Sequence, residues 1–503
     1  MKLYQIKRIQ ILKEKLNLIL TKLFRVKLHV LCIIISLFIF ACEDILQEEP
    51  KALATENFYN TADEIESAVF GIYSPLRTSG MFGGRYQSIL DAETDFSKGR
   101  GSYSPLSEWQ GYDATNIGRA GEFWTYFYQA IRIANLVIKN SADATSVDEG
   151  TRDALIGEAK YLRAFCYFHL VRHWGAVPLR TVENALEQDL PRTPVAEVYE
   201  LIISDLQYAE AKLPGTAKAA GRATKWAAKT LLADVYLQLE DWSNARTKSL
   251  EVINSGSYSL IEVSTSDDYY KIFGPDVVTT TEEIFYFKFN RTSYSWFTDL
   301  AHRSTSPWNN YNGYSVHYCD SVTFKVIREW DYNDLRKSFN LYNWDIGMGS
   351  ETTMLFKKFI DPERVGHSGV DWPIYRYAYV LLLYAEADCR ANNGPTADGM
   401  EKLNMIHRRA YGKNSGTASE VDFKLSDYTK DSFVDLVMKE RMYEMMYEGK
   451  RYFDLKRTGK IKTAIQDAFG ITVADKHLWW PIPNTEYDYN EAIDPETDQN
   501  PGY

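Results

Sequence analysis

Cysteine is scarce in this chain of 503 residues, and its positions follow no paired spacing. The five cysteines are Cys32, Cys42, Cys166, Cys319 and Cys389. This pattern excludes a disulfide framework and a CxxC-type zinc site. Positive charge is also in deficit, because 57 Lys and Arg stand against 68 Asp and Glu, for a formal net charge of −11. Non-specific nucleic-acid binding needs a basic surface, so nucleic acid is not expected as a partner.

A long hydrophobic run is missing as well. The main apolar run, residues 31–41, has eleven residues, whereas a membrane-spanning helix needs about 20. No transmembrane helix is therefore expected in the mature protein. A composition of 45% hydrophobic and 25% charged residues nevertheless excludes disorder of the whole chain and is typical of a globular protein.

The common catalytic motifs are absent too. His169 and His173 have i, i+4 spacing but lack the Glu of an HExxH zinc site, and no Walker loop or GxGxxG motif occurs. Residues 366–369 resemble GxSxG, but their second glycine comes one place too early. Glutamates 440, 444 and 448 recur every four residues, which is more typical of an ion-paired or solvated helix face than of a catalytic site. We expect no catalytic residue, no cofactor and no metal site.

The amino terminus has the features of a lipoprotein signal. Residues 1–30 carry eight Lys or Arg and one Glu, and the apolar run 31–41 follows them. This order is typical of a signal peptide. Residues 39–42, Ile-Phe-Ala-Cys, have the form of a lipobox, in which a small residue precedes a cysteine that is acylated. Residues 1–41 are thus predicted to be removed and Cys42 to carry the lipid, the alternative being an ordinary signal peptide with a coincidental cysteine.

Helical periodicity recurs along most of the remaining chain. It predicts helices in residues 58–76, 121–140, 157–179, 194–214, 221–253, 374–392, 399–412 and in the first part of 431–459. Residues 221–253 look like a helix pair of the tetratricopeptide kind. Residues 77–118 and 255–372 show no sustained period apart from one expected strand, 283–289, and the proline-containing tail 477–490 is expected to run extended over the surface. The predicted fold is mostly α: tetratricopeptide-like helix pairs form a scaffold with a loop-rich ligand-binding region and little β-structure.

Seven ordered segments resemble the SusD/RagB family. They are EAKYLRAFCYFHLVRHWGAVPL, PRTPVAEVYELIISDL, GRATKWAAKTLLADVYL, YRYAYVLLLYAEA, RMYEMMYEGKRYFDLKRTG, LWWPIP and the terminal QNPGY. The resemblance covers nearly all of residues 42–503, with an amino-terminal half at about 42–250 and a carboxyl half at about 255–503. It implies a surface-exposed outer-membrane lipoprotein that binds a nutrient, usually a glycan. It also implies a SusC-like TonB-dependent transporter as partner.

The two irregular regions carry the candidate ligand-binding residues. Aromatic residues make up 14% of the chain, and sugar rings present apolar C–H faces that stack on aromatic planes. The ring candidates are Tyr103 and Trp109 from the first region and Trp296, Trp308, Tyr311 and Tyr314 from the second. Polar neighbours for sugar hydroxyls are Asn309, Asn310, Asn312 and Asp91.

Glycan capture and delivery to a transporter is the leading functional hypothesis. Peptide uptake, which also occurs within the family, remains an alternative. A helical glycoside hydrolase would need two carboxylates that meet in space, and a protein-binding scaffold would use the concave face of the helix pairs. These alternatives stay open from the sequence.

Overall fold

The computed structural model describes residues 13, 15–16, 18–22, 58–112, 114–293, 295–308, 313–348 and 351–503. The chain divides into two units, residues 1–58 and 59–503. In the first unit, the residues described between 13 and 22 are helical and exposed. No helix within the described ranges is both long and apolar enough to cross a membrane.

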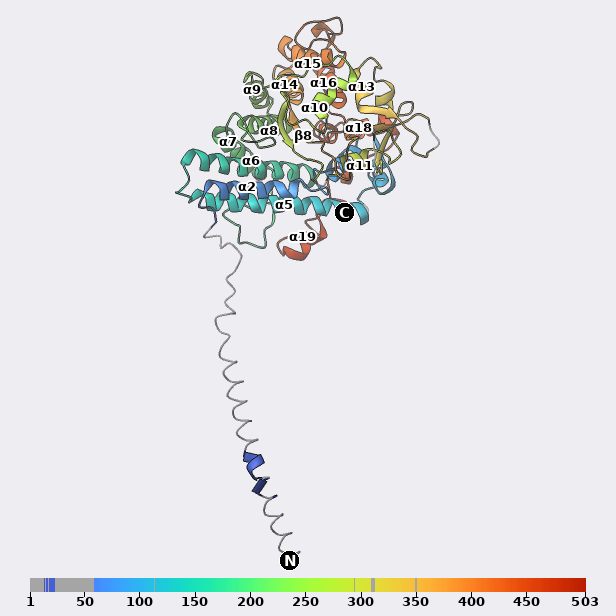
Figure 1. Cartoon of the computed structure of the whole chain (residues 1–503). Helices are drawn as coiled ribbons and strands as arrows, with labels where there is room; N and C mark the ends of the chain where they lie inside the picture. Colours follow the sequence, from blue (N-terminus) through green and yellow to red (C-terminus); the bar gives the residue numbers. More distant parts are fainter. Residues whose placement is uncertain are drawn as a thin grey trace, which may run out of the picture. The chain divides into compact units, whose positions relative to one another are not determined.

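The long helices follow the predicted order (Figure 1). They are α2 (Ala62–Leu76), α5 (Ala114–Ala142), α6 (Glu149–Trp174), α7 (Val195–Lys212), α8 (Lys225–Gln238), α9 (Trp242–Ile253), α14 (Tyr377–Ala391), α15 (Ala397–Ala410) and α16 (Lys430–Glu444). Successive helices pack on one another: α5 lies against α2 and α6, α7 against α6, and α8 against α7 and α9. Helix α14 then packs on α9 and is followed by α15 and α16, so the carboxyl half continues the row. The prediction of a mostly helical scaffold is confirmed.

Helix α6 shows why these segments are helical. The Asp148 side chain accepts a hydrogen bond from the Thr151 amide at the start, and Gly175 ends the helix with a φ of +74°, a conformation that glycine adopts without steric cost. Tyr161, Phe165 and the residues around them are buried on both sides of the helix. A helix without a polar face is packed between neighbours.

Short helices and strands fill the two regions predicted to be irregular, together with the carboxyl end. The α-helices are α3 (Arg85–Ala92), α4 (Ser104–Ser107), α10 (Tyr270–Phe273), α11 (Phe297–Ala301), α12 (Lys325–Arg328), α13 (Leu335–Asn340), α17 (Arg451–Arg457), α18 (Ile461–Phe469) and α19 (Asn484–Tyr489). The 3₁₀ turns are η2 (Gly101–Tyr103), η3 (Ser266–Tyr269), η4 (Leu425–Asp427) and η5 (Asp475–Leu478).

The strands form three small antiparallel sheets within the described residues. The four-stranded sheet has the order β1 (Lys98–Gly99), β5 (His317–Asp320), β7 (Thr353–Phe356) and β6 (Leu341–Asn343). The other two sheets pair β2 (Val177–Pro178) with β3 (Arg192–Thr193) and β4 (Glu283–Phe287) with β8 (Trp372–Arg376). The predicted strand at 283–289 is therefore present, and sheet remains a minor part of the fold.

Three expectations for individual segments were wrong. Residues 77–118 are not one loop, because they contain α3, of which every residue from Tyr86 to Ala92 is buried. The segment 374–392 begins with strand β8 and becomes helical only at Tyr377. The tail 477–490 does not run over the surface throughout: Trp480 is fully buried and stacks on His173 with ring centroids 3.8 Å apart.

Candidate functional site

Strand pairing brings the two irregular regions together. Lys98 lies opposite Tyr318 and Gly99 opposite His317, and the Arg100 amide continues the contact by donating to the Val316 carbonyl at 2.8 Å. A Cβ at Gly99 would collide with the backbone of Tyr103. Glycine therefore allows the chain to turn into η2 directly after the strand.

Trp296 is held in place by contacts with the two glycines that directly precede α3. Its amide donates to the Gly83 carbonyl at 2.7 Å. Gly84 has a φ of +144°, and a Cβ there would lie 3.2 Å from Trp296 and from Leu300. The close approach of the two segments thus depends on glycine. The Tyr314 amide in turn donates to the Asp299 carbonyl at 2.7 Å, which ties Tyr314 to α11.

A cleft of about 680 Å³ lies where these segments meet. Three of the predicted aromatic residues, Tyr103, Trp296 and Tyr314, line it. Tyr314 is 61% exposed, whereas Tyr103 is 5% exposed and has the guanidinium of Arg119 over its ring at 4.3 Å. Two of the rings differ in what they can offer: Tyr314 presents an open face, while Tyr103 forms part of the wall.

Four arginines line the same cleft: Arg85, Arg100, Arg119 and Arg303. Arg100 donates to the Ser315 carbonyl at 3.0 Å and to its hydroxyl at 2.6 Å. Arg119 donates to the Ser102 hydroxyl and to the Asn116 side-chain oxygen, both at 2.8 Å. Arg85 pairs with Glu122, and its guanidinium lies 5.1 Å from the Trp296 ring centroid.

Asp299 is the only acidic residue among the described residues that line the cleft. Both of its carboxylate oxygens accept from Arg364, at 3.0 and 3.2 Å. Burial raises the pKa of Asp299, and Arg364 opposes this shift. The carboxylate is therefore held in a structural ion pair, and the cleft is cationic overall.

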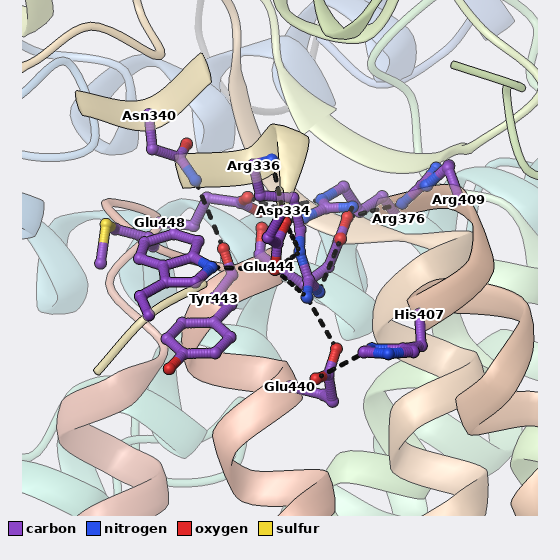
Figure 2. A network of polar contacts seen from close by, with 12 residues as sticks. Asp334, Arg336, Asn340, Arg376, His407, Arg409, Glu440, Tyr443, Glu444 and Glu448 are labelled. Carbon is purple, nitrogen blue, oxygen red and sulfur yellow. Dashed lines mark hydrogen bonds and ion pairs between the residues drawn. The ribbon is translucent and has the colours of Figure 1, made fainter. Parts of the chain in front are cut away.

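The glutamates spaced by four residues lie in a different place. Figure 2 shows Glu440, Glu444 and Glu448 facing arginines from other segments. Arg376 and Arg409 each contact Glu444 at 2.6 Å. Glu440 contacts Arg336 at 2.8 Å; although burial raises its pKa, Arg336 and His407 lower it to about 2. The prediction of an ion-paired helix face is confirmed.

The histidine pair is also part of the core. The Tyr86 hydroxyl lies 2.6 Å from Nδ1 of His169 and 2.7 Å from Nε2 of His173. Burial lowers the pKa of both imidazoles well below the usual value. They pack in the core as neutral rings. Within the described part of the chain, no group of three or more His, Cys, Asp or Glu is placed to hold a metal ion.

Two family profiles match the chain. Residues 304–503 match the profile described as "SusD family", and residues 46–237 match the one described as "Starch-binding associating with outer membrane". The chain belongs to the SusD/RagB family.

Relatives in this family align over nearly full length. The SusD-like protein P25 of Formosa agariphila is 25% identical over 528 residues, with 92% of this chain and 97% of the relative covered. The crystal structure of a SusD homologue from Bacteroides thetaiotaomicron superposes with a TM-score of 0.76 at 22% identity, covering 89% of this chain and 98% of that one. The structure of surface glycan-binding protein A from Bacteroides fluxus superposes with a TM-score of 0.70 at 20% identity, covering 88% of this chain and 100% of that one.

Three other predicted site residues do not line this cleft. Trp109 is 5% exposed, and Trp308 packs edge-on against Tyr342 with ring centroids 6.3 Å apart. Asp91 is 1% exposed and bonds to Gln87. The remaining candidates, Asn309, Asn310, Tyr311, Asn312 and the lipid site Cys42, lie outside the described residues.

The sequence interpretation missed the arginines of the cleft. Arg85, Arg100 and Arg119 lie in or directly after the first irregular region, in a chain that has fewer basic than acidic residues. The arginine close to a tyrosine in Arg-Gly-Ser-Tyr, residues 100–103, was the available signal. Their convergence with Arg303 depends on the β1–β5 pairing, which no local pattern reveals.

Proposed function

We propose that this SusD/RagB protein is a lipid-anchored protein of the outer-membrane surface that captures an oligosaccharide and delivers it to a SusC-like TonB-dependent transporter. The observation that carries the proposal is the cleft in which Tyr103 from one segment and Trp296 and Tyr314 from another converge with hydrogen-bond donors. Ligand sites combine such apolar surfaces with a few placed polar groups.

The chemistry of the cleft suits a sugar. The exposed ring of Tyr314 and the partly exposed ring of Trp296 offer planes for stacking. The guanidinium groups of Arg100 and Arg119 offer donors to hydroxyl oxygens. Stacking can then act on an apolar C–H face of a pyranose ring, and hydrogen bonding can act on the hydroxyl groups around its edge.

Capture without cleavage agrees with the acidic residues present. Glycoside hydrolysis uses two carboxyl groups about 5 to 9.5 Å apart. Asp299 is the only carboxylate among the described residues that line the cleft, and both of its oxygens accept hydrogen bonds from Arg364. Incubation with a bound glycan should therefore release no shorter products, and their appearance would favour the enzyme hypothesis.

Relatives and the chain's amino terminus support the location and the ligand class. The structurally similar protein from Bacteroides fluxus is named as a surface glycan-binding protein, and the profile matching residues 46–237 describes association with the outer membrane. The lipobox at Cys42 supplies the anchor in this proposal. Delivery to a SusC-like transporter rests on the family resemblance, and recovery of a large barrel in pull-downs from lipid-anchored cells would support it.

Binding can be tested with the predicted rings. A glycan array first identifies the polysaccharides that bind, and calorimetry then compares the wild type with Trp296→Ala and Tyr314→Ala. By analogy with bases on aromatic platforms, each loss should cost about 1 to 3 kcal/mol. Tyr489→Ala is the control, because Tyr489 is 72% exposed and does not line the cleft. Unchanged affinity in both cleft variants would move the site elsewhere, and binding of peptides but not glycans would favour peptide uptake.

A further inference from the structure

The candidate cleft differs in charge from the protein as a whole. The chain has a formal net charge of −11, yet four of the described residues that line the cleft are arginines and one is acidic. Asp299 is neutralised by Arg364, and Arg85 is paired with Glu122. The positive charges of Arg100 and Arg119 therefore lie in one cavity of an acidic protein.

Two of these arginines have only neutral partners. Arg100 donates to the carbonyls of Tyr314, Ser315 and Ile346 and to the Ser315 hydroxyl. Arg119 donates to Ser102 and to the Asn116 amide oxygen. No carboxylate of the described residues contacts either guanidinium. Burial, followed by the charge of Arg303, lowers the pKa of Arg100, which shows that another cation faces the same space.

Some other arginines that are withdrawn from water are neutralised within the fold. Arg163 contacts Asp205 at 2.7 Å, Arg222 contacts Glu158 at 2.5 Å, and Arg451 contacts Asp95 at 2.5 Å. Withdrawing a guanidinium from water without a counter-charge is unfavourable, and a second cation nearby adds to the cost. A ligand anion would remove this cost in the cleft.

We propose that the captured glycan is acidic, with carboxylate or sulfate groups bound by Arg100 and Arg119 while Trp296 and Tyr314 stack on its sugar rings. This inference rests on the proposed glycan-binding function and specifies its ligand class. The planar guanidinium suits the purpose because it donates two parallel hydrogen bonds to the oxygens of a carboxylate or a sulfate. Neighbouring arginines and rings match a polymer in which charged groups recur beside apolar sugar faces.

The test uses the full-length protein and an array of purified polysaccharides. Its acidic members are pectic, alginate-type and sulfated polymers, and its neutral members are glucans, mannans and xylans. The polymer bound most tightly should be acidic, and its affinity should fall at least tenfold between 50 and 500 mM NaCl because salt screens the ion pairs. A carboxyl-reduced and a desulfated form of that polymer then distinguish the two kinds of anion, since only removal of the recognised group abolishes binding.

Variants locate the effect. Arg100→Gln and Arg119→Gln should each weaken binding of the acidic polymer at least tenfold. Arg100→Lys should give an intermediate loss, because it keeps the charge but not the paired donors. Arg132→Gln is the matched control: Arg132 is exposed on α5 and does not line the cleft, so affinity should not change. If Arg100→Gln impairs folding, as judged by thermal unfolding, Arg119→Gln decides the question.

The outcomes separate the inference from the function beneath it. A neutral polymer bound most tightly, with affinity unaffected by Arg100→Gln and Arg119→Gln, would overturn the inference while leaving glycan capture in place. Binding to no polysaccharide on the array would count against glycan capture itself.

Discussion

His302 and His317 stand directly beside the cleft segments and set a limit on acid stability. His302 contacts the Phe359 carbonyl at 3.1 Å through Nε2, and His317 contacts the Ser88 carbonyl through Nε2. Burial lowers the pKa of each imidazole from 6.5 to about 4. In the unfolded chain, both imidazoles would have a pKa near the ordinary 6.5. The unfolded state therefore binds more protons than the folded state between pH 6.5 and pH 4.

We therefore expect the free energy of unfolding to fall as the pH drops from 6.5 towards 4. Each histidine contributes a slope of up to about 1.4 kcal/mol per pH unit. Urea unfolding at several pH values measures this slope. His302→Gln or His317→Gln should each reduce the slope by the contribution of one titrating group, up to about 1.4 kcal/mol per pH unit. Identical slopes in the wild type and both variants would contradict the assignment.

Single residues also show where sequence reasoning reaches its limit. Rings in an irregular region were predicted to bind ligand, yet Tyr314 is 61% exposed and Trp109 is 5% exposed. Composition does not distinguish a ring that anchors its own loop from a ring that faces a ligand, because burial is decided by residues distant in the sequence. Tyr103 shares a cleft with Trp296 and Tyr314 because β1 pairs with β5 and because the Trp296 amide bonds to Gly83 just before α3.

At the scale of elements, amphipathic helices were predictable and fully buried ones were harder to recognise. Helix α3 was missed because all of its residues from Tyr86 onward are buried, polar Gln87 and Asp91 included, which removes the alternation that marks a surface helix. Prolines at 481 and 483 correctly excluded a long helix in the tail. They gave no indication that Trp480 enters the core, where Pro481 accepts a hydrogen bond from Trp174 at 2.9 Å.

Helix α16 depends on its buried carboxylates for stability. Glu444 is 3% exposed and contacts Arg376 and Arg409 at 2.6 Å each. Glu444→Gln would remove a charge that both guanidinium groups contact, leaving Arg376 with Glu448 and Arg409 with Glu282. We expect a loss of about 3 kcal/mol in unfolding free energy. Denaturant unfolding checks this value.

Glu401→Gln provides the control on the neighbouring helix α15. Glu401 also pairs with an arginine, Arg408, at 2.7 Å, but its side chain is 43% exposed. Exposed pairs contribute about 0 to 1 kcal/mol, so the control should lose less than about 1 kcal/mol. Equal losses in the two variants would show that burial does not determine the effect.

At the scale of the whole molecule, we propose that a lipid on Cys42 anchors the protein to the membrane. Cys42→Ala should release the protein from membranes, because acyl chains contribute about 0.8 kcal/mol per buried CH₂ and several together hold a protein on a bilayer. Fractionation with a high-salt wash measures retention. Cys32→Ala is the matched control, since Cys32 lies within the predicted signal peptide, and it should stay membrane-bound. Retention of the Cys42→Ala protein in the washed membranes would refute the lipid site.

The central claim is that a glycan occupies the cleft between η2 and α11, lined by Tyr103, Trp296 and Tyr314. A crystal structure of the mature protein with an oligosaccharide selected on the glycan array tests it most directly. We expect a sugar ring stacked on Tyr314 or Trp296, with a charged substituent within hydrogen-bond distance of Arg100 or Arg119. Density for the oligosaccharide on another face of the molecule, with this cleft occupied by solvent alone, would contradict it.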